Sequence, residues 1–535
     1  MARTFKDPLR PNEVLPGHCA PHRPSQGIQG RRKRRRQKSA PHHYSMSSCD
    51  SFRRKDWRLF GRRSKKAPAF GAREKIFLNT RATFLKFLAL IYFFAFLSLW
   101  TQVLGLFGSQ GILPVSELLS AVKSQLGTAG YWFFPTLCWF NSSDWFLQIL
   151  CGGGTVLSLF AILGIAEMPV LFLLWFLYLS MVTVGRDFMS FQWDALLLET
   201  GFLAIFFTPL PFIKSSERSK PPTIVLWLFR WLLFRLLFSS GAVKWLSGDP
   251  AWHHLTALQF HYQTQPLPTW IAWYAHQLPA VFQKFSGGLM FFIELVVPFT
   301  IFMPKKIRRG GFGVLVFFQT LIFITGNYCF FNLLTLAICV LLLEDEAAPR
   351  SRWGPWLLAA LLFLTSLVQM LHGFGLAPSW TRPILQLERT LSPYRITNNY
   401  GLFAVMTTVR NEIILEGSND RRTWAPYEFK YKPGDVSRRP VFVAPHQPRL
   451  DWQMWFAALG HYRDNPWFIN FCRRVLEGSP EVLKLLQKNP FPDKPPRYLR
   501  AVVYEYRFSD FKSKRRDGAW WTRELKGLYC PVMVR

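Results

Sequence analysis

The sequence lacks closely spaced cysteine pairs. Its eight Cys stand at positions 19, 49, 138, 151, 329, 339, 472 and 530, and none belongs to a C-x-x-C motif. Neither a zinc ribbon nor a thioredoxin-like redox site is therefore predicted. Cys472 and Cys530 share the last segment of the chain, where they are either two free thiols, which is the default, or a disulfide formed in an oxidising compartment.

Catalytic signatures are missing as well. The chain has no Gly-x-Ser-x-Gly elbow, no P-loop, no Rossmann fingerprint and no paired Asp-x-Asp. His253, His254 and His261 fall in Lys244–Pro268, but they form no H-E-x-x-H arrangement, so no metal site is predicted. That stretch is expected to be an ordered loop whose aromatic side chains pack on the bundle. We expect a protein that is not an enzyme and needs no cofactor or metal.

Acidic residues are scarce, with 32 Asp and Glu against 65 Lys and Arg. The imbalance is greatest before Thr83, where 22 basic residues, including the run Arg31–Lys38, face five acids. Pro, Ser and His are frequent there and apolar periodicity is absent, so residues 1–82 are predicted to be a disordered basic tail. A nucleic-acid patch and a spurious extension upstream of Met46 are the alternatives. Because the run precedes a membrane segment, we expect it to fix orientation, with no nucleic-acid partner.

Apolar residues make up half of the chain, and they are clustered. Phe87–Leu106 runs for 20 residues without a charge, long enough to cross a hydrocarbon core about 30 Å thick. No small-residue cleavage site follows it, so it is expected to stay as an anchor. Residues 83–375 are predicted to be a multi-span α-helical membrane domain of about nine segments. These are Phe87–Leu106, Trp145–Ala166, Val170–Val184, Ala195–Ile213, Thr223–Trp245, Gly288–Met303, Gly311–Thr325, Phe330–Leu343 and Trp356–Leu371.

Loop charges predict the orientation. With a cytoplasmic N-terminus, the basic loops Lys214–Lys220 and Lys305–Arg309 fall on the cytoplasmic side, as the positive-inside rule requires. The sequon at Asn141 falls on the far side, which makes Asn141 a glycosylation candidate. An odd number of crossings then places the C-terminal segment on the lumenal side.

Ionisable residues inside the predicted spans are expected to be buried among the helices, because charges at bilayer depth are costly. Either Glu199 or Glu294 pairs with Arg230 or Arg235 to fix helix packing, or these groups line a functional cavity. Such membrane-buried polar residues are Glu199, Arg230, Arg235, Lys244 and Glu294.

Residues 390–535 are predicted to form an α+β extramembrane domain, because short β-type runs and amphipathic segments replace the long apolar ones. The fold class is therefore a polytopic α-helical membrane protein with a C-terminal α+β domain. Expected strands are Glu412–Glu416, Tyr427–Tyr431 and Leu499–Phe508, and expected helices are Leu450–Gly460, Trp467–Leu476 and Pro480–Gln487.

The segment Ala444–Gly460 concentrates the candidate binding residues. Arg449 and Asp451 are either a ligand-reading pair or a loop-fixing salt bridge. Trp452, Trp455 and Phe456 either fill a core, which we expect for at least two of the three, or form a surface patch for a partner. These five residues, Arg449, Asp451, Trp452, Trp455 and Phe456, are the candidate client-binding set.

Several long blocks in one order resemble the lipase maturation factors from Leu85 to Tyr529. They are GILP at 111–114, LLETGFLAIF at 197–206, FRWLLFRLLFSSGAVK at 229–244, ALQFHYQTQPLP at 257–268, EFKYKPGD at 428–435, PHQPRLDWQMWFAALG at 445–460 and NPF at 489–491. The resemblance implies a multi-pass glycoprotein of the endoplasmic-reticulum membrane, or of the inner membrane if the source is a bacterium. It also implies a chaperone-like factor for the folding, dimer assembly and export of secreted lipases, with membrane lipid and lipase-type clients as partners.

A remoter resemblance supplies the alternative function. SGAVKWLSGDPAWHHLTAL, at residues 240–258, looks like part of the vitamin K-dependent carboxylase-type transmembrane domain. That resemblance implies a membrane enzyme in which Lys244 is a catalytic base. A lysine at the edge of a low-dielectric bundle could have the lowered pKa that a base needs. An ion pair or a lysine that reaches the membrane interface is the simpler interpretation of Lys244.

Overall fold

The computed structural model describes residues 70–208, 223–344 and 353–535, so most of the predicted basic tail and the loop 214–220 lie outside the described residues. Seven described helices have the length and composition to cross a membrane. They comprise Thr80–Trp100 of α1 (Phe70–Trp100), α5 (Asp144–Ile162), α6 (Glu167–Val184), α8 (Thr223–Leu246), Ala280–Phe302 formed by α12 (Ala280–Leu295) and η4 (Val297–Phe302), α13 (Lys305–Thr325) and Trp356–Gly373 of α15 (Trp353–Gly373).

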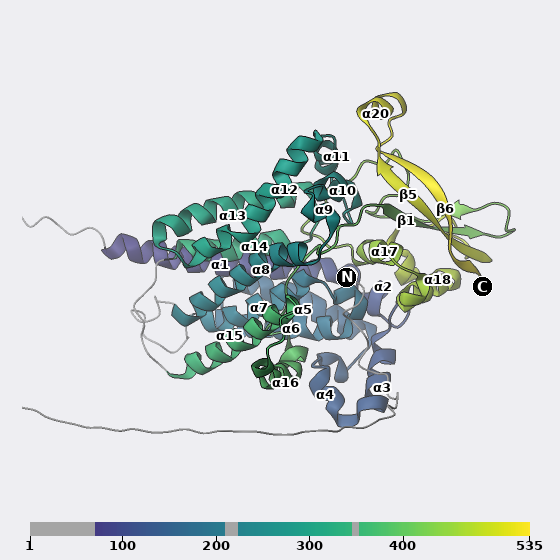
Figure 1. The fold of residues 1–535 in the computed structure, drawn as a ribbon. Coiled ribbons are helices and arrows are strands. Elements are labelled where there is room, and N and C mark those ends of the chain that lie inside the picture. Colours follow the sequence, from purple (N-terminus) through teal and green to yellow (C-terminus); the bar gives the residue numbers. More distant parts are fainter. Residues whose placement is uncertain (1–69, 209–222, 345–352) are drawn as a thin grey trace, which may run out of the picture. The chain divides into compact units, whose positions relative to one another are not determined.

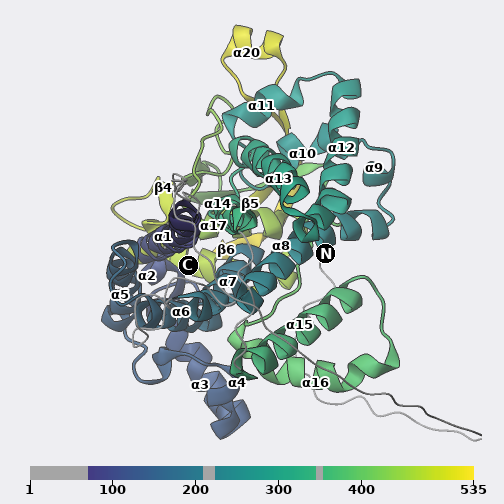
Figure 2. The same ribbon diagram turned by 90° about the vertical axis from the view of Figure 1, so that its left-hand side faces the viewer.

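Two predicted segments form shorter apolar helices, α7 (Gln192–Phe207) and α14 (Phe331–Val340), the latter continued by η5 (Leu341–Leu343). The other differences between the predicted and the observed helices concern the residues at which a helix begins or ends. α1 begins at Phe70, inside the predicted tail, and ends at Trp100 rather than Leu106. The separate helix α2 (Val103–Phe107) follows, because the chain turns at Thr101 and Gln102, whose side chains bond to Ser98 O. Figures 1 and 2 show the long helices lying side by side as one bundle.

Small residues bring α1 and α5 close together. A Cβ added at Gly154 would overlap the ring of Phe96, and one at Gly152 would lie 3.0 Å from the Trp100 ring. Such close approach is how membrane helices gain van der Waals contact, because burial against apolar lipid supplies little driving force. The Gly152–Gly154 run therefore sets the α1–α5 contact.

Short helices fill the connections between the spans. The predicted loop Lys244–Pro268 contains α9 (Pro250–His253) and α10 (Ala257–Thr264), and α11 (Trp270–His276) follows it. The remaining elements between the spans are α3 (Val115–Leu126), η1 (Gly127–Ala129), α4 (Gly130–Phe133), η2 (Leu137–Trp139) and η3 (Arg186–Met189). After the last span come η6 (Ser379–Thr381), α16 (Arg382–Leu391) and η7 (Ser392–Tyr394), which lead to the C-terminal region.

The C-terminal region contains an antiparallel sheet with the strand order β2-β1-β5-β6. Its strands are β1 (Arg410–Ser418), β2 (Ala425–Pro426), β5 (Tyr498–Phe508) and β6 (Trp521–Val534). In the β1–β5 register Ile413 faces Val503, which agrees with the predicted strands Glu412–Glu416 and Leu499–Phe508. A second, two-stranded sheet pairs β3 (Glu428–Phe429) with β4 (Leu486–Lys488). Sequence reasoning did not anticipate β6.

Helical segments lie between the strands of this region. They are α17 (Arg449–Ala458), η8 (Tyr462–Asp464), α18 (Pro466–Glu477), α19 (Pro480–Leu483) and α20 (Phe511–Asp517). The predicted helix Pro480–Gln487 is wrong beyond Leu483, because Leu486–Lys488 form strand β4, in which Leu486 and Lys488 pair with β3.

The bundle and the C-terminal region share one buried apolar cluster. Trp193 of α7 lies edge-to-face against Trp452 of α17 with ring centroids 4.7 Å apart. Phe188 of η3 meets Trp467 of α18 in the same geometry at 5.3 Å. Phe70–Arg535 accordingly forms one unit, and the C-terminal region is packed on the bundle rather than attached by a flexible linker.

Candidate functional site: the junction of bundle and C-terminal region

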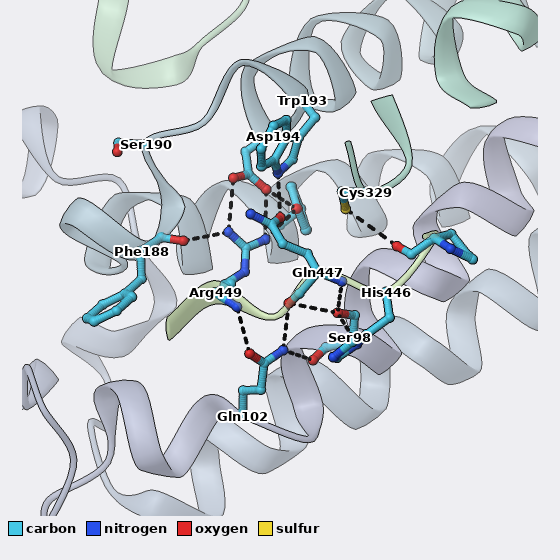
Figure 3. Close-up of polar contacts among 12 residues, drawn as sticks. Ser98, Gln102, Phe188, Ser190, Trp193, Asp194, Cys329, His446, Gln447 and Arg449 are labelled. Carbon is cyan, nitrogen blue, oxygen red and sulfur yellow. Dashed lines mark hydrogen bonds and ion pairs between the residues drawn. The ribbon is translucent and has the colours of Figure 1, made fainter. Parts of the chain in front are cut away.

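The chain segment before α17 enters the bundle beside the end of α1 (Figure 3). The Gln102 side chain donates to the Gln447 carbonyl at 2.8 Å and accepts from the Arg449 backbone N–H at 2.9 Å. Ser98 Oγ accepts from the Gln447 N–H at 2.9 Å and lies 2.8 Å from His446 Nδ1. We call this contact the junction. It consists of Ser98, Gln102, Trp193 and Asp194 from the bundle, and His446, Gln447 and Arg449 from the C-terminal region.

A buried ion pair forms the centre of the junction. Arg449 Nη1 and Nη2 lie 3.0 and 2.9 Å from the two Asp194 oxygens, with side-chain exposures of 1% for Arg449 and 0% for Asp194. Nη1 also donates to the Phe188 carbonyl at 2.6 Å, and the Tyr178 hydroxyl donates to Asp194 at 2.5 Å. Burial is the largest single influence and would lower the Arg449 pKa, but Asp194 and Tyr178, with a smaller contribution from Cys329, together raise that pKa above its usual value. Bidentate geometry, with the further hydrogen bonds to the Phe188 carbonyl and from the Tyr178 hydroxyl, is what makes this buried charge pair tolerable.

Asp451 does not pair with Arg449. Its Oδ1 accepts from the backbone N–H groups of Tyr431 at 2.8 Å and Lys432 at 2.9 Å, which holds the loop after β3. The alternative of a salt bridge between Arg449 and Asp451 is therefore wrong, whereas a role of the two residues in reading a ligand stays a prediction. Residues two apart on a helix do not face each other. The Arg449 partner lies 255 positions away along the chain, so no local pattern could have revealed it.

Two of the three aromatic residues on α17 belong to the core, as expected. Trp452 and Trp455 are 3% and 6% exposed, and Trp455 Nε1 donates to the Thr264 carbonyl at 2.8 Å. Phe456 is 42% exposed. The client-binding role of the five-residue set stays a prediction, and Phe456 is the member with substantial surface to offer.

Glu199, the second acid of α7, holds another part of the downstream chain. It forms a buried ion pair with Arg235, one of the pairings that the sequence left open. Its Oε2 also accepts from the Asn398 N–H at 2.9 Å and from the Tyr400 hydroxyl at 2.8 Å. Thus Asp194 and Glu199 both bind residues that follow the last span. Arg230, by contrast, donates to the Glu344 carbonyl at 3.2 Å.

A third attachment was not anticipated from the sequence. The Arg410 guanidinium, at the start of β1, donates to the carbonyls of Gln263 at 2.7 Å, Gln265, and Pro266 at 2.9 Å. Arg410 also pairs with Glu412 at 2.6 Å, and both are buried. The α10–α11 connection is therefore bonded directly to the sheet.

A cleft of about 470 Å³ opens beside the junction. One wall is the end of α1, and the other is the C-terminal region. Its apolar lining includes Phe94, Leu97, Val443, Pro448 and Leu485. Its polar and charged lining residues are Ser98, Thr101, Gln102, Lys430, His446 and Asp451. Burial is the main cause that lowers the His446 pKa to about 4, so this ring is neutral near pH 7.

Comparison with known proteins decides the family. Residues 79–350 match the model of the lipase maturation factor transmembrane domain, and residues 396–531 match that of the lipase maturation factor C-terminal domain. The chain belongs to the lipase maturation factor family.

Relatives in this family match along most of their length. Lipase maturation factor 2 of Xenopus laevis is 36% identical over 85% of this chain and 82% of its own. Lipase maturation factor 1 of Bos taurus is 36% identical over 89% of this chain and 92% of its own, and human lipase maturation factor 2 is also 36% identical. No solved structure gives a significant match.

Within this family member, Lys244 is engaged in an ion pair. Its Nζ lies 2.6 and 2.8 Å from the two Glu294 oxygens, and both side chains are buried. The ammonium also lies 5.5 Å from the centre of the Trp252 ring. The structure thus supports the interpretation of Lys244 as a member of an ion pair. None of the relatives named above is named as a carboxylase.

The other candidate residues are placed as follows. His253 Nε2 contacts the Trp245 carbonyl at 2.8 Å, whereas His261 Nε2 contacts the Tyr328 hydroxyl at 3.2 Å, so these rings do not converge. Within the described ranges no three His, Cys, Asp or Glu side chains group as metal ligands. Cys472 and Cys530 are buried free thiols. Asn141 is half-buried, and its Oδ1 accepts from the Ser143 N–H at 2.8 Å; its glycosylation stays a prediction.

Proposed function

We propose that this protein is a membrane-bound, non-enzymatic maturation factor that promotes folding, dimer assembly and export of secreted lipases or related clients. The names of its relatives support the client class. The observation that carries the mechanism is the buried Arg449–Asp194 pair, which joins the C-terminal region to the bundle. A region joined in this way presents its surface at a fixed height beside the membrane, where newly translocated chains emerge.

The proposed site of action is the endoplasmic-reticulum membrane, with the N-terminus cytoplasmic and the C-terminal region lumenal. We count α7 and α14 as crossings beside the seven longer spans, because only this total of nine starts α13 on the cytoplasmic side and would leave the C-terminal region in the lumen. Lys305, Lys306 and Arg309 are exposed at the start of α13, and the positive-inside rule assigns that end to the cytoplasm. Asn141 would then be available for glycosylation.

We propose that this protein binds its client transiently and thereby shields apolar surface of the client from water. Phe456 stands at the edge of the junction, with its ring centre 6.0 Å from that of Phe191 and 42% of its surface exposed. An exposed aromatic ring on a rigid support is the type of group that anchors protein contacts. Since the sequence has no P-loop, folding or dimerisation of the client itself would end the contact.

Co-production with a secreted dimeric lipase tests this function. Deleting residues 398–535 should abolish active secreted lipase while leaving lipase synthesis intact, and a normal active yield would overturn the proposal. Phe456→Asp should lower the active yield without lowering the amount of this protein in membranes. Leu525→Asp is the matched control, because Leu525 is 58% exposed on β6. Equal losses from the two variants would contradict the assignment to Phe456.

A further inference from the structure

The turn between β5 and β6 projects a short basic helix, α20, with the sequence FKSKRRD. Asp510 caps it by accepting from the Ser513 N–H at 2.7 Å, and Gly518 closes it with φ 68°. Asp517 pairs with its neighbour Arg516 at 2.8 Å. Among the residues that the structure describes, Lys512 and Arg515 form no ion pair, and both are exposed. The α20 turn therefore carries two uncompensated positive charges.

Aromatic contacts fix this turn to α11. The rings of Phe511 and Trp273 meet edge-to-face at 5.0 Å. Lys514 Nζ lies 3.4 Å from the centre of the Trp520 ring and 4.3 Å from that of Trp273. Lys514 is thus used internally, whereas Phe511 keeps half of its surface exposed. The turn is held in place rather than free to swing.

The element to which α20 is fixed leads directly into the membrane. Three residues separate α11 from α12, and α12 begins the span Ala280–Phe302. The first turns of α12 expose Val281 by 79%, Phe282 by 53% and Phe285 by 68%, which suits side chains that face lipid. Figures 1 and 2 show α20 beyond α11, at the outer side of the bundle. The connectivity places the α20 turn at the level where a bilayer ends and its headgroups begin.

We propose that the α20 turn rests on the adjoining membrane surface and binds anionic phospholipid headgroups. Lys512 and Arg515 supply the charge, and Phe511 enters the interfacial layer, where aromatic rings are favoured. Basic residues close to an anionic surface are attracted to it within a Debye length, about 10 Å at 0.1 M salt. The contact would support the sheet at the Phe508 end of β5, from which the α20 turn projects.

A spin label tests this contact in the full-length protein. The six described cysteines are buried, so Cys19→Ser and Cys49→Ser leave an introduced cysteine as the accessible thiol. The label is placed through Ser513→Cys, which keeps the backbone N–H used by the Asp510 cap. The protein is reconstituted in phosphatidylcholine nanodiscs with and without phosphatidylserine. Power saturation then gives the ratio of label accessibility to oxygen and to a water-soluble nickel chelate, which rises with membrane depth.

The ratio should rise when phosphatidylserine is present, and it should fall back at about 1 M salt, where the Debye length is about 3 Å. The double variant Lys512→Gln/Arg515→Gln should abolish the rise. A label introduced through Arg422→Cys, in the β1–β2 turn at the opposite end of the sheet, should read as water-exposed throughout. A ratio at position 513 that is the same in both lipids, whether interfacial or water-like, would overturn the proposal.

Discussion

The junction and bundle differ from strands β5 and β6 of the sheet in how deeply their ion pairs are buried. Arg449–Asp194, Arg235–Glu199 and Lys244–Glu294 all have side chains at most 8% exposed. On β5 and β6, Glu505 pairs with Arg507 and Lys526, whose side chains are 67% and 40% exposed. Loss of one partner from a buried pair leaves an uncompensated charge, whereas water solvates a lone surface charge. The buried pairs therefore hold elements together, and the surface pairs contribute little.

The largest losses of stability are expected where a substitution breaks a buried ion pair, and Lys244 of the bundle is one such residue. Lys244→Met leaves Glu294 buried without its partner and should destabilise the protein by about 3–5 kcal/mol. Thermal unfolding in detergent and the amount of folded protein in membranes measure this loss. Lys244→Met combined with Glu294→Met should restore much of it. If Lys244→Met instead removed function at full stability, and the double variant remained inactive, Lys244 would be a base rather than a structural ion pair.

Close packing of the bundle predicts a smaller effect. Gly154→Ala places a Cβ against the Phe96 ring and should cost about 1–3 kcal/mol through overpacking. Gly153→Ala is the matched control, since its Cβ meets nothing within 4 Å. The melting temperatures of the two variants in one detergent should therefore diverge, with Gly153→Ala at or above the parent. Equal melting temperatures would mean that α1 and α5 do not approach as closely as described.

At the junction, stability should depend on pH through His446. Burial, with smaller contributions from Lys430 and Arg449, lowers its folded pKa to about 4, and an unfolded histidine titrates near 6.5. Between these values the unfolded chain binds a proton that the folded chain does not. Stability should therefore fall as pH drops from about 6.5 to 4, by up to about 1.4 kcal/mol per pH unit from this residue.

His446→Gln should make this pH dependence shallower by one proton. The melting temperature measured from pH 7 to pH 4 gives the slope. His261, whose pKa burial also lowers to about 4, is retained in both proteins and contributes equally to each. Parallel curves for the parent and the variant would contradict the assignment.

The smallest effect belongs to the sheet surface. Arg507→Met removes a partner of Glu505 that is 67% exposed, and exposed pairs contribute about 0–1 kcal/mol. Its melting temperature should stay close to that of the parent and should respond little to salt. A loss as large as that from Lys244→Met would remove the distinction between buried and surface pairs.

Local signals in the sequence account for the elements that were predicted correctly. Long uncharged runs marked the membrane helices, and the alternation around Val503 marked β5. The end of α1 was placed too late because Thr101 and Gln102, where the chain turns, are uncharged and do not interrupt the apolar run. β6 was missed because residues 522–528 are exposed on both faces and include Arg523, Glu524 and Lys526, so no alternation is visible.

The junction could be predicted only in part. The aromatic residues of α17 indicated a packed helix, and Glu199 and Arg235 were recognised as buried polar groups. The Arg449–Asp194 and Glu199–Asn398 contacts join residues 255 and 199 positions apart, and they follow from the packed fold rather than from spacing. Charge type alone left several partners open for each residue.

A double-mutant cycle on Arg449 and Asp194 tests most directly whether the C-terminal region and the bundle form one unit. Arg449→Met and Asp194→Leu should each lower the free energy of unfolding by about 3–5 kcal/mol, since each leaves a buried charge unpaired. The combined variant should lose less than either single variant, because an apolar pair then replaces the ion pair. Losses that simply add would contradict a direct contact between the two regions at this pair.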